Sequence, residues 1–153
     1  MNIVQSIKRV SVTPPGAIVD AASYTTAIID TLGYHKLAVT VYLGATDIAM
    51  AALKLQESDA SNMGSATDIT GCVFGTSTNP DTGTTSALPT ADDDGKFFTF
   101  FVDLQGRKRY IDLVATAGDG SAGTYLTAWA ELFVGNDNPE NATERGLAAN
   151  LIA

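Results

Sequence analysis

Apolar side chains recur at every second position in segment after segment of this chain, and this pattern constrains the fold most strongly. Alternation with a period of two is typical of half-buried β-strands, whereas an amphipathic helix repeats every 3.6 residues. Residues 35–44, 97–104 and 107–117 each alternate in this way and carry polar side chains on the opposite face. The side chains expected on the buried faces are Leu37, Val39, Val41 and Leu43, then Phe98, Phe100, Val102 and Leu104, and then Ile111, Leu113 and Ala115.

Residues 47–59 are ambiguous, because their Ala, Met, Leu, Lys and Gln content favours a helix. Ala49, Ala51, Leu53 and Leu55 nevertheless alternate with polar or longer side chains, and the neighbouring segments are strands. We therefore expect a strand here, with a helix as the alternative. Shorter strands are expected within residues 4–12, 24–30 and 70–75.

Segments rich in turn-forming residues separate these strands at 13–16, 57–68 and 75–95, and the last is a long surface excursion. About eight strands of this kind predict an all-β, jelly-roll-like antiparallel sandwich, with an up-and-down barrel as the alternative. We expect one sandwich domain over residues 1–134. Residues 135–153 form a polar tail with a few apolar residues near its end, which we expect to be disordered, a short helix or an arm that docks on a neighbour.

Composition excludes several classes of function. The chain has 153 residues, 45% of them hydrophobic, which suffices for a single core. Its formal net charge of −8 disfavours binding to nucleic acid, since surfaces that bind phosphates are basic. Cys72, the single cysteine, allows no internal disulfide. No signal peptide or membrane span is visible, so we expect synthesis in the cytoplasm and no membrane partner.

Gly118, Gly120 and Gly123 stand in the spacing G-x-G-x-x-G, which in a dinucleotide-binding protein opens a helix. Here residues 124–134 alternate as a strand, so the helix that would hold a pyrophosphate is missing from the pattern. We interpret the glycines as a turn that joins two antiparallel strands through positions that tolerate positive φ.

Residues 124–134 carry apolar side chains on both faces. One face is entirely aliphatic, and the other combines Tyr125, Trp129 and Phe133 with Thr127 and Glu131. The aromatic face is either the inner face of the sandwich or an exposed contact patch. We expect it to be buried.

Three further features resemble reactive or ligand sites only in part. Asp92, Asp93 and Asp94 begin like a calcium loop, but Lys96 stands where the next ligand is required, so an acidic turn is expected and a calcium site is the alternative. His35 and Cys72 belong to no recognisable nucleophile motif. We expect no catalytic residue, metal or cofactor.

The one basic cluster is the run Arg107, Lys108 and Arg109. It is either the solvated end of a strand or a docking point for an acidic partner surface, because guanidinium groups bind carboxylates through paired hydrogen bonds.

Residues 14–31, 43–61 and 92–125 together resemble small proteins encoded beside the major capsid protein in tailed double-stranded DNA bacteriophages, taken to be capsid cement or decoration proteins. The resemblance depends on the joint order of TDIAM, LQESD, RKRYIDL and ATAGDG, since each fragment by itself is weak. It covers most of residues 14–134 and fades in the tail.

This resemblance implies a jelly-roll or related sandwich that assembles as a homotrimer on the outer surface of the virion head. There it would clamp adjacent major capsid protein subunits without catalysing a reaction. Contacts are expected first in residues 2–12, because an exposed first strand can pair with the sheet edge of another chain, and then in the 75–95 loop and the tail. The residues proposed for capsid or subunit contact are Ile3, Val4, Ile7, Lys8, Arg9, Arg107, Lys108 and Arg109.

Two other functions remain open. A tail or head-fibre adhesion module would bind a glycan or receptor, with Tyr110, Tyr125 and Trp129 stacking on sugars. A hydrolase would need a carboxylate pair or a nucleophile with a base, and the sequence shows neither arrangement locally.

Overall fold

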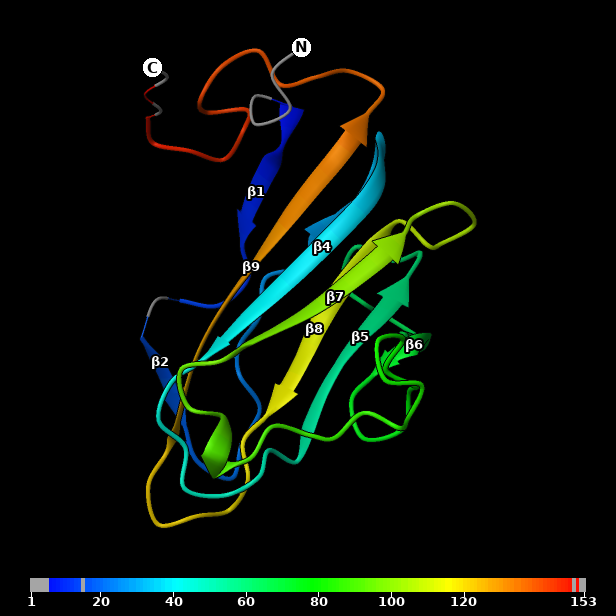
Figure 1. Ribbon diagram of the computed structural model, residues 1–153. Helices are drawn as coiled ribbons and strands as arrows, with labels where there is room; N and C mark the ends of the chain where they lie inside the picture. The colour runs from blue at the N-terminus through cyan, green and yellow to red at the C-terminus, as the bar shows by residue number, and fades with distance from the viewer. Residues whose placement is uncertain (1–5, 15, 150, 152–153) are drawn as a thin grey trace.

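The strands of the protein form two antiparallel sheets that face each other. The structure is a computed structural model that describes residues 6–14, 16–149 and 151. Figure 1 shows the sheets as two layers, with β1, β9, β4 and β7 in one and β8, β5 and β6 in the other. The five-stranded sheet contains β1 (Lys8–Ser11), β2 (Ala17–Val19), β4 (Tyr34–Leu43), β7 (Phe97–Asp103) and β9 (Thr124–Gly135). The four-stranded sheet contains β3 (Ile29–Asp30), β5 (Ala52–Ser58), β6 (Thr67–Val73) and β8 (Tyr110–Thr116).

The strand order is that of a jelly roll. One sheet runs β1-β9-β4-β7, with β2 also paired to β9, and the other runs β3-β8-β5-β6. Counting β1 and β2 as one interrupted first strand gives eight strands in two sheets of four. The interruption is a bulge, because the N–H groups of Val12 and Thr13 both donate to the carbonyl oxygen of Ala128. The predicted jelly-roll sandwich is confirmed, and the barrel alternative is wrong.

The core lies between the sheets and is built by the alternation that the sequence displays. Leu37, Val39, Val41 and Leu43 of β4 are fully buried, as are Leu53 and Leu55 of β5. The strand expected within residues 47–59 is therefore confirmed, although its composition favours a helix. β5 is paired on both sides, with β8 and β6, and this long-range pairing outweighs local propensity. Among the described residues, no helix is long and apolar enough to cross a membrane.

The glycine-rich segment connects β8 to β9, and no helix follows it. The segment is therefore a connection between two strands, as expected. It is not a hairpin within one sheet, because β8 and β9 lie in different sheets, and none of Gly118, Gly120 and Gly123 uses the positive φ that glycine tolerates. These glycines instead provide space. A β-carbon on Gly118 would overlap the carbonyl oxygen of Ala49, and one on Gly120 would overlap the carboxylate of Asp47.

Asp47 holds this connection against the loop that follows β4. Its Oδ2 accepts hydrogen bonds from the N–H groups of Ser121 (2.5 Å) and Ala122 (2.8 Å) and from the Ser121 hydroxyl (3.0 Å). These donors, with the Ala122 N–H as the largest influence, lower the pKa of Asp47 because they favour the ionised form. The dense hydrogen bonding explains why the backbone comes so close at Gly120.

The 75–95 excursion and the tail are both arranged against the domain. The excursion is mostly exposed, carries a bridge between Thr78 and Thr85, and ends in a 3-10 turn at Ala91–Asp93. In the tail, the carbonyl oxygen of Arg145 accepts a hydrogen bond of 2.8 Å from the N–H of Arg9 in β1. Figure 1 accordingly shows the C-terminal segment beside the first strand. This part of the tail thus packs on its own chain.

The carboxyl group of Asp112 is partly buried in the four-stranded sheet, and this burial can be tested by its effect on stability at different pH. Asp112 lies on β8, accepts a 2.7 Å hydrogen bond from the Thr26 hydroxyl, and has its pKa raised above 3.8 by burial. A carboxyl whose pKa is higher in the folded state stabilises the fold when protonated, and this contribution is lost as pH rises through the folded-state pKa. We expect Asp112→Asn to raise the melting temperature at pH 7 and the difference to shrink below about pH 4.

Asp68 is the matched control, because Gln56 and Lys54 lower its pKa. The sign is therefore reversed: Asp68→Asn should lower the melting temperature at pH 7, with the difference again shrinking at low pH. Thermal unfolding of the two variants and the parent between pH 3 and 8 tests both signs. Equal shifts at all pH values would show that neither carboxyl is perturbed in this way.

Candidate binding surface

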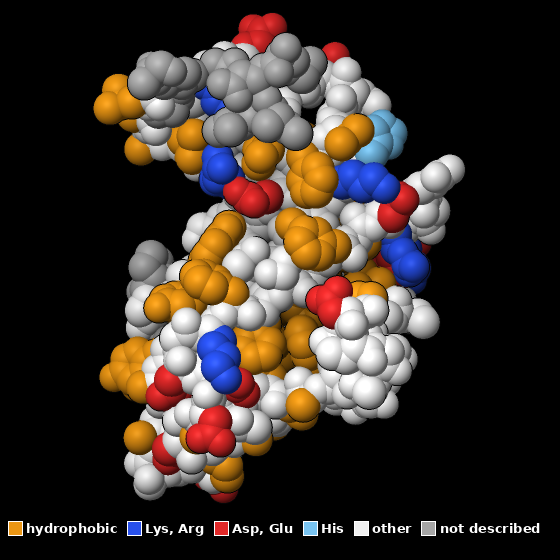
Figure 2. All heavy atoms as spheres, viewed as in Figure 1, with side chains coloured by type: hydrophobic (Ala, Val, Ile, Leu, Met, Phe, Trp, Pro, Cys, Tyr) orange, Lys and Arg blue, Asp and Glu red, His pale blue; other side chains and the backbone are white. Residues whose placement is uncertain are grey.

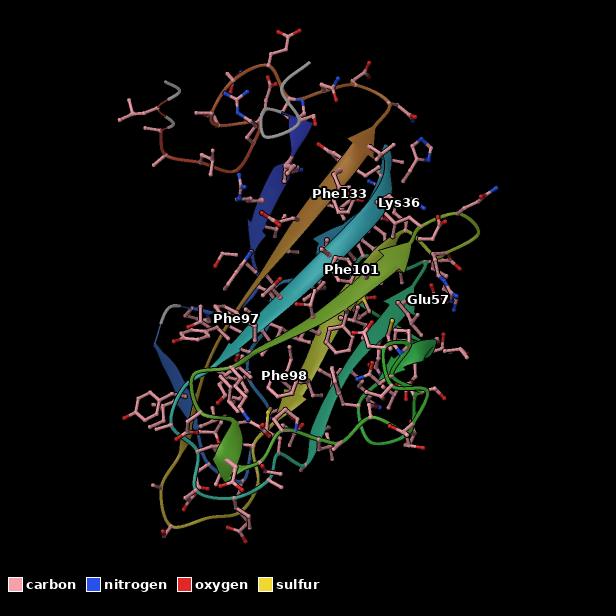
Figure 3. All side chains as sticks on the ribbon, viewed as in Figure 1. Lys36, Glu57, Phe97, Phe98, Phe101 and Phe133 are labelled. Atoms are coloured by element: carbon pink, nitrogen blue, oxygen red, sulfur yellow. The ribbon has the colours of Figure 1, made fainter. Side chains whose placement is uncertain are left out.

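The outer face of the five-stranded sheet carries a group of aromatic side chains. The register places Tyr42 opposite Phe97 on β7, and Thr40 opposite Trp129 on β9. One step along the strands, Ala38 lies opposite Phe101. Figure 2 shows apolar side chains gathered over these strands, and Figure 3 labels Phe97, Phe101 and Phe133 on this face. We call this surface the aromatic face and define it by Tyr42, Phe97, Phe101, Tyr125, Trp129 and Phe133.

Tyr42, Phe97 and Trp129 contact one another, and several rings of the aromatic face are open to solvent. Tyr42 stacks on Phe97 with centroids 4.6 Å apart, and Phe97 meets Trp129 edge to face at 6.3 Å. Phe97 is 62% exposed and Phe101 is 76% exposed. Preformed aromatic pairs of this kind present a large apolar area at low entropic cost on binding, because their rings are already ordered.

The expectation that the Trp129 face is buried was wrong. The core takes the aliphatic face of β9 instead, and Trp129 is half-buried on the outside. Glu131 explains this choice. Its carboxylate shares the Trp129 face and pairs with Arg9 at 3.0 Å, an arrangement that needs solvent on one side. If that face were buried, the Glu131 carboxylate would lie inside the sandwich.

Two ion pairs lie at one end of the aromatic face, where Glu131 stands between Trp129 and Phe133 on β9. Arg9 of β1 pairs with Glu131 of β9, and Lys36 of β4 pairs with Asp103 of β7 at 2.7 Å. Figure 3 shows Lys36 close to Phe133 and Phe101 on this part of the sheet. Exposed pairs add little stability, roughly 0–1 kcal/mol each, so their main effect is to place charged groups beside the aromatic rings, and protein interfaces commonly combine apolar and charged residues.

The residues proposed for contact from the sequence fall in different places. Ile3 and Val4 lie outside the described residues. Ile7 precedes β1 and is half-buried, and Lys8 and Arg9 begin β1. The basic cluster, residues 107–109, precedes β8.

Arg107 and Arg109 already face acidic residues of their own chain. Arg107 lies 3.3 Å from the Glu57 carboxylate, and Arg109 forms two hydrogen bonds of 2.8 and 2.7 Å with Asp30. Arg109 lowers the pKa of Asp30, mainly through its hydrogen bond, and Lys8 adds a weaker electrostatic effect. Asp30 thus interacts electrostatically with both Lys8 in β1 and Arg109 in the basic cluster. A carboxylate of another protein would have to displace Glu57 or Asp30 from these arginines, so docking at this cluster stays a prediction.

The remaining candidates have structural partners. His35 Nε2 lies 2.9 Å from the Asn136 side-chain oxygen. Cys72 is buried in β6, and burial raises the pKa of its thiol, the opposite of what an activated nucleophile needs. Asp93 binds Lys96 and caps the turn at Thr90, while Asp94 accepts the N–H of Thr46. Within the described ranges, no group of three or more His, Cys, Asp or Glu side chains is placed to hold a metal ion.

The chain matches no family model and no curated protein. The aromatic face emerges only from strand pairing, since its members come from three strands that are distant in sequence.

Proposed function

We propose that this protein is a structural component of a bacteriophage particle. In this proposal it binds the outer surface of the head and holds adjacent major capsid protein subunits together. The resemblance of residues 14–134 to cement proteins suggests the class of partner, and the aromatic face supplies the surface. The jelly roll supports the proposal as a rigid scaffold that needs no disulfide.

The observation that carries the proposal is the apolar outer face of a domain whose core is already complete. Both sheets bury their aliphatic side chains against each other, so the aromatic face is not required to close the sandwich. A group of exposed aromatic side chains with charged residues beside it is typical of a site for another macromolecule. On a symmetric shell, many copies would turn modest affinity per contact into stable attachment.

The glycan-binding alternative receives less support from the arrangement of its aromatics. Tyr125 and Trp129 share β9, but Tyr110 lies in the other sheet, where the Arg109 guanidinium sits 5.0 Å from its ring centroid. A sugar would therefore meet two of the three rings. Binding of the purified protein to a glycan array would favour this alternative.

Binding to heads that lack the protein tests the proposal. We expect the purified chain to co-sediment with heads of its parent phage made without this gene. The double variant Tyr42→Ser with Tyr125→Ser should bind at least about tenfold more weakly, because both rings lie on the aromatic face at 41% and 46% exposure.

Leu32→Ser is the matched control, since Leu32 is 65% exposed but lies in the turn between β3 and β4. It should bind like the parent. Failure of the parent chain to bind heads would refute the proposal. Equal loss in Leu32→Ser and in the tyrosine variant would argue against the aromatic face as the contact.

A further inference from the structure

Strand β7 lies at the edge of the five-stranded sheet, where its one neighbour among the described strands is β4. The N–H of Leu43 donates to the Lys96 carbonyl, and the N–H of Leu104 donates to the His35 carbonyl. The backbone N–H and C=O groups of the even-numbered residues of β7 therefore point toward β4. Since antiparallel strands alternate, the N–H and C=O groups of Phe97, Thr99 and Phe101 point away from the sheet.

The other sheet edges are short, interrupted or covered within the part of the chain that the structure describes. Arg145 covers β1 at Arg9, and β3 has two residues. β6 contains Gly71 with φ of +89°, and its pairing with β5 shifts register. By contrast, β7 has seven residues, and among the described residues no backbone hydrogen bond outside the sheet ladders reaches Phe97, Thr99 or Phe101. Such an edge is a template for another strand.

The sequence of this edge is its own complement. Residues 97–101 read FFTFF, a palindrome centred on Thr99. If two copies pair antiparallel about Thr99, Phe97 of one lies opposite Phe101 of the other on the outer face, and Phe98 lies opposite Phe100 on the inner face. Every aromatic then meets an aromatic, and such cross-strand pairs stabilise a sheet. A shift of two residues would instead place Phe101 opposite Thr99 and Phe97 opposite Asp103.

An open pocket lies beside this edge, between β7 and β6. It is lined on one side by Thr99, Phe100 and Phe101, and on the other by residues 71–74 and by Ser77, Thr78, Pro80 and Ser86 of the 75–95 excursion. Phe74 meets Phe98 and Phe100 edge to face at 5.5 and 5.2 Å. Figure 2 shows the molecule hollowed below β7, with apolar side chains on the floor.

We propose that β7 pairs with β7 of a second copy about a two-fold axis at Thr99, which joins the two five-stranded sheets into one. The second copy is the occupant because the outward backbone groups, the palindrome and the exposed rings of Phe97 and Phe101 are all self-complementary under a two-fold axis. This inference does not depend on binding to a phage head, and it is tested on the purified protein.

A cysteine at the axis tests the register directly. Thr99→Cys in a Cys72→Ser background places two thiols opposite each other in a hydrogen-bonded pair, with Cα atoms about 5.5 Å apart, within disulfide range. We expect oxidised glutathione to convert most of this variant to a covalent dimer. Thr82→Cys in the same background, on the exposed 75–95 loop, should stay largely uncrosslinked. Equal cross-linking of both variants would overturn the proposed register.

Sedimentation of variants without new cysteines tests the pairing itself. Thr99→Pro removes the outward N–H and leaves the bonds to β4, so it should weaken association at least about tenfold, whereas Thr99→Val keeps the N–H and should associate like the parent. Phe101→Lys places a charge on the edge and should also weaken association, so the test survives if the proline variant misfolds. A monomeric parent, or a trimer whose mass these changes leave unaltered, would overturn the proposal.

Discussion

Replacing Leu132 by alanine should lower the free energy of unfolding by about 2–5 kcal/mol. Leu132 lies in β9, fully buried on the inner face, with Lys8 of β1 and Leu37 of β4 as its register partners. β9 is paired on both sides over this stretch, so the backbone has little freedom to close the cavity. Chemical denaturation followed by tryptophan fluorescence measures the loss, since Trp129 is on the same strand.

The matched control is Tyr125→Ala on the outer face of the same strand. Tyr125 is 46% exposed, and its removal leaves no enclosed cavity, so the free energy of unfolding should change by about 1 kcal/mol or less. The pair of variants tests which face of β9 the core uses. A larger loss for Tyr125→Ala than for Leu132→Ala would restore the interpretation in which the aromatic face is buried.

The sequence predicts which face is buried wherever only one face is apolar. On β4 and β8 the opposite face is largely polar, as with Lys36 and Thr40 or with Asp112 and Thr116, and the buried faces are those expected. β9 is apolar on both faces, so alternation does not distinguish them. The deciding residue is Glu131, whose partner Arg9 is far away in sequence, and only the paired strands reveal that the charge sits at the surface.

The candidate sites needed the fold for a similar reason. The partners of the basic cluster are distant in sequence: Glu57 lies 50 residues from Arg107, and Asp30 lies 79 residues from Arg109. The local sequence predicts that Arg107 and Arg109 will pair with carboxylates, but it does not predict which carboxylates these are. The FFTFF motif, in contrast, is visible in the sequence, and only its position on a free edge is new.

The two proposed contact surfaces share Phe97 and Phe101 and have different symmetry. The other members of the aromatic face lie on β4 and β9 and look outward from the sheet, whereas the edge of β7 runs along its side, so a head contact through Tyr42, Tyr125 and Trp129 can coexist with a two-fold contact through β7. The homotrimer implied by the resemblance would need a third surface. An assembly that uses both threefold and two-fold contacts would link neighbouring trimers into a net around a closed shell.

Substitutions at Gly118 should reveal why the connection between β8 and β9 requires glycine. Gly118→Ala should lower the free energy of unfolding by about 1–3 kcal/mol, because the new methyl group would overlap the carbonyl oxygen of Ala49, which is backbone and moves little. Gly118→Asn should cost more, since a larger side chain enters the same space. Asp119→Ala, at the exposed neighbouring position, should have little effect.

Gly106 provides the opposite case, and the comparison separates space from conformation. It has φ of +75°, and a β-carbon added there would meet no atom within 4 Å, so conformation and not crowding favours glycine. Asparagine tolerates the left-handed region better than alanine does, so Gly106→Asn should be more stable than Gly106→Ala. Thermal unfolding of the four variants should therefore show opposite orders at the two sites. The same order at both would mean that Gly118, too, is selected for its backbone conformation.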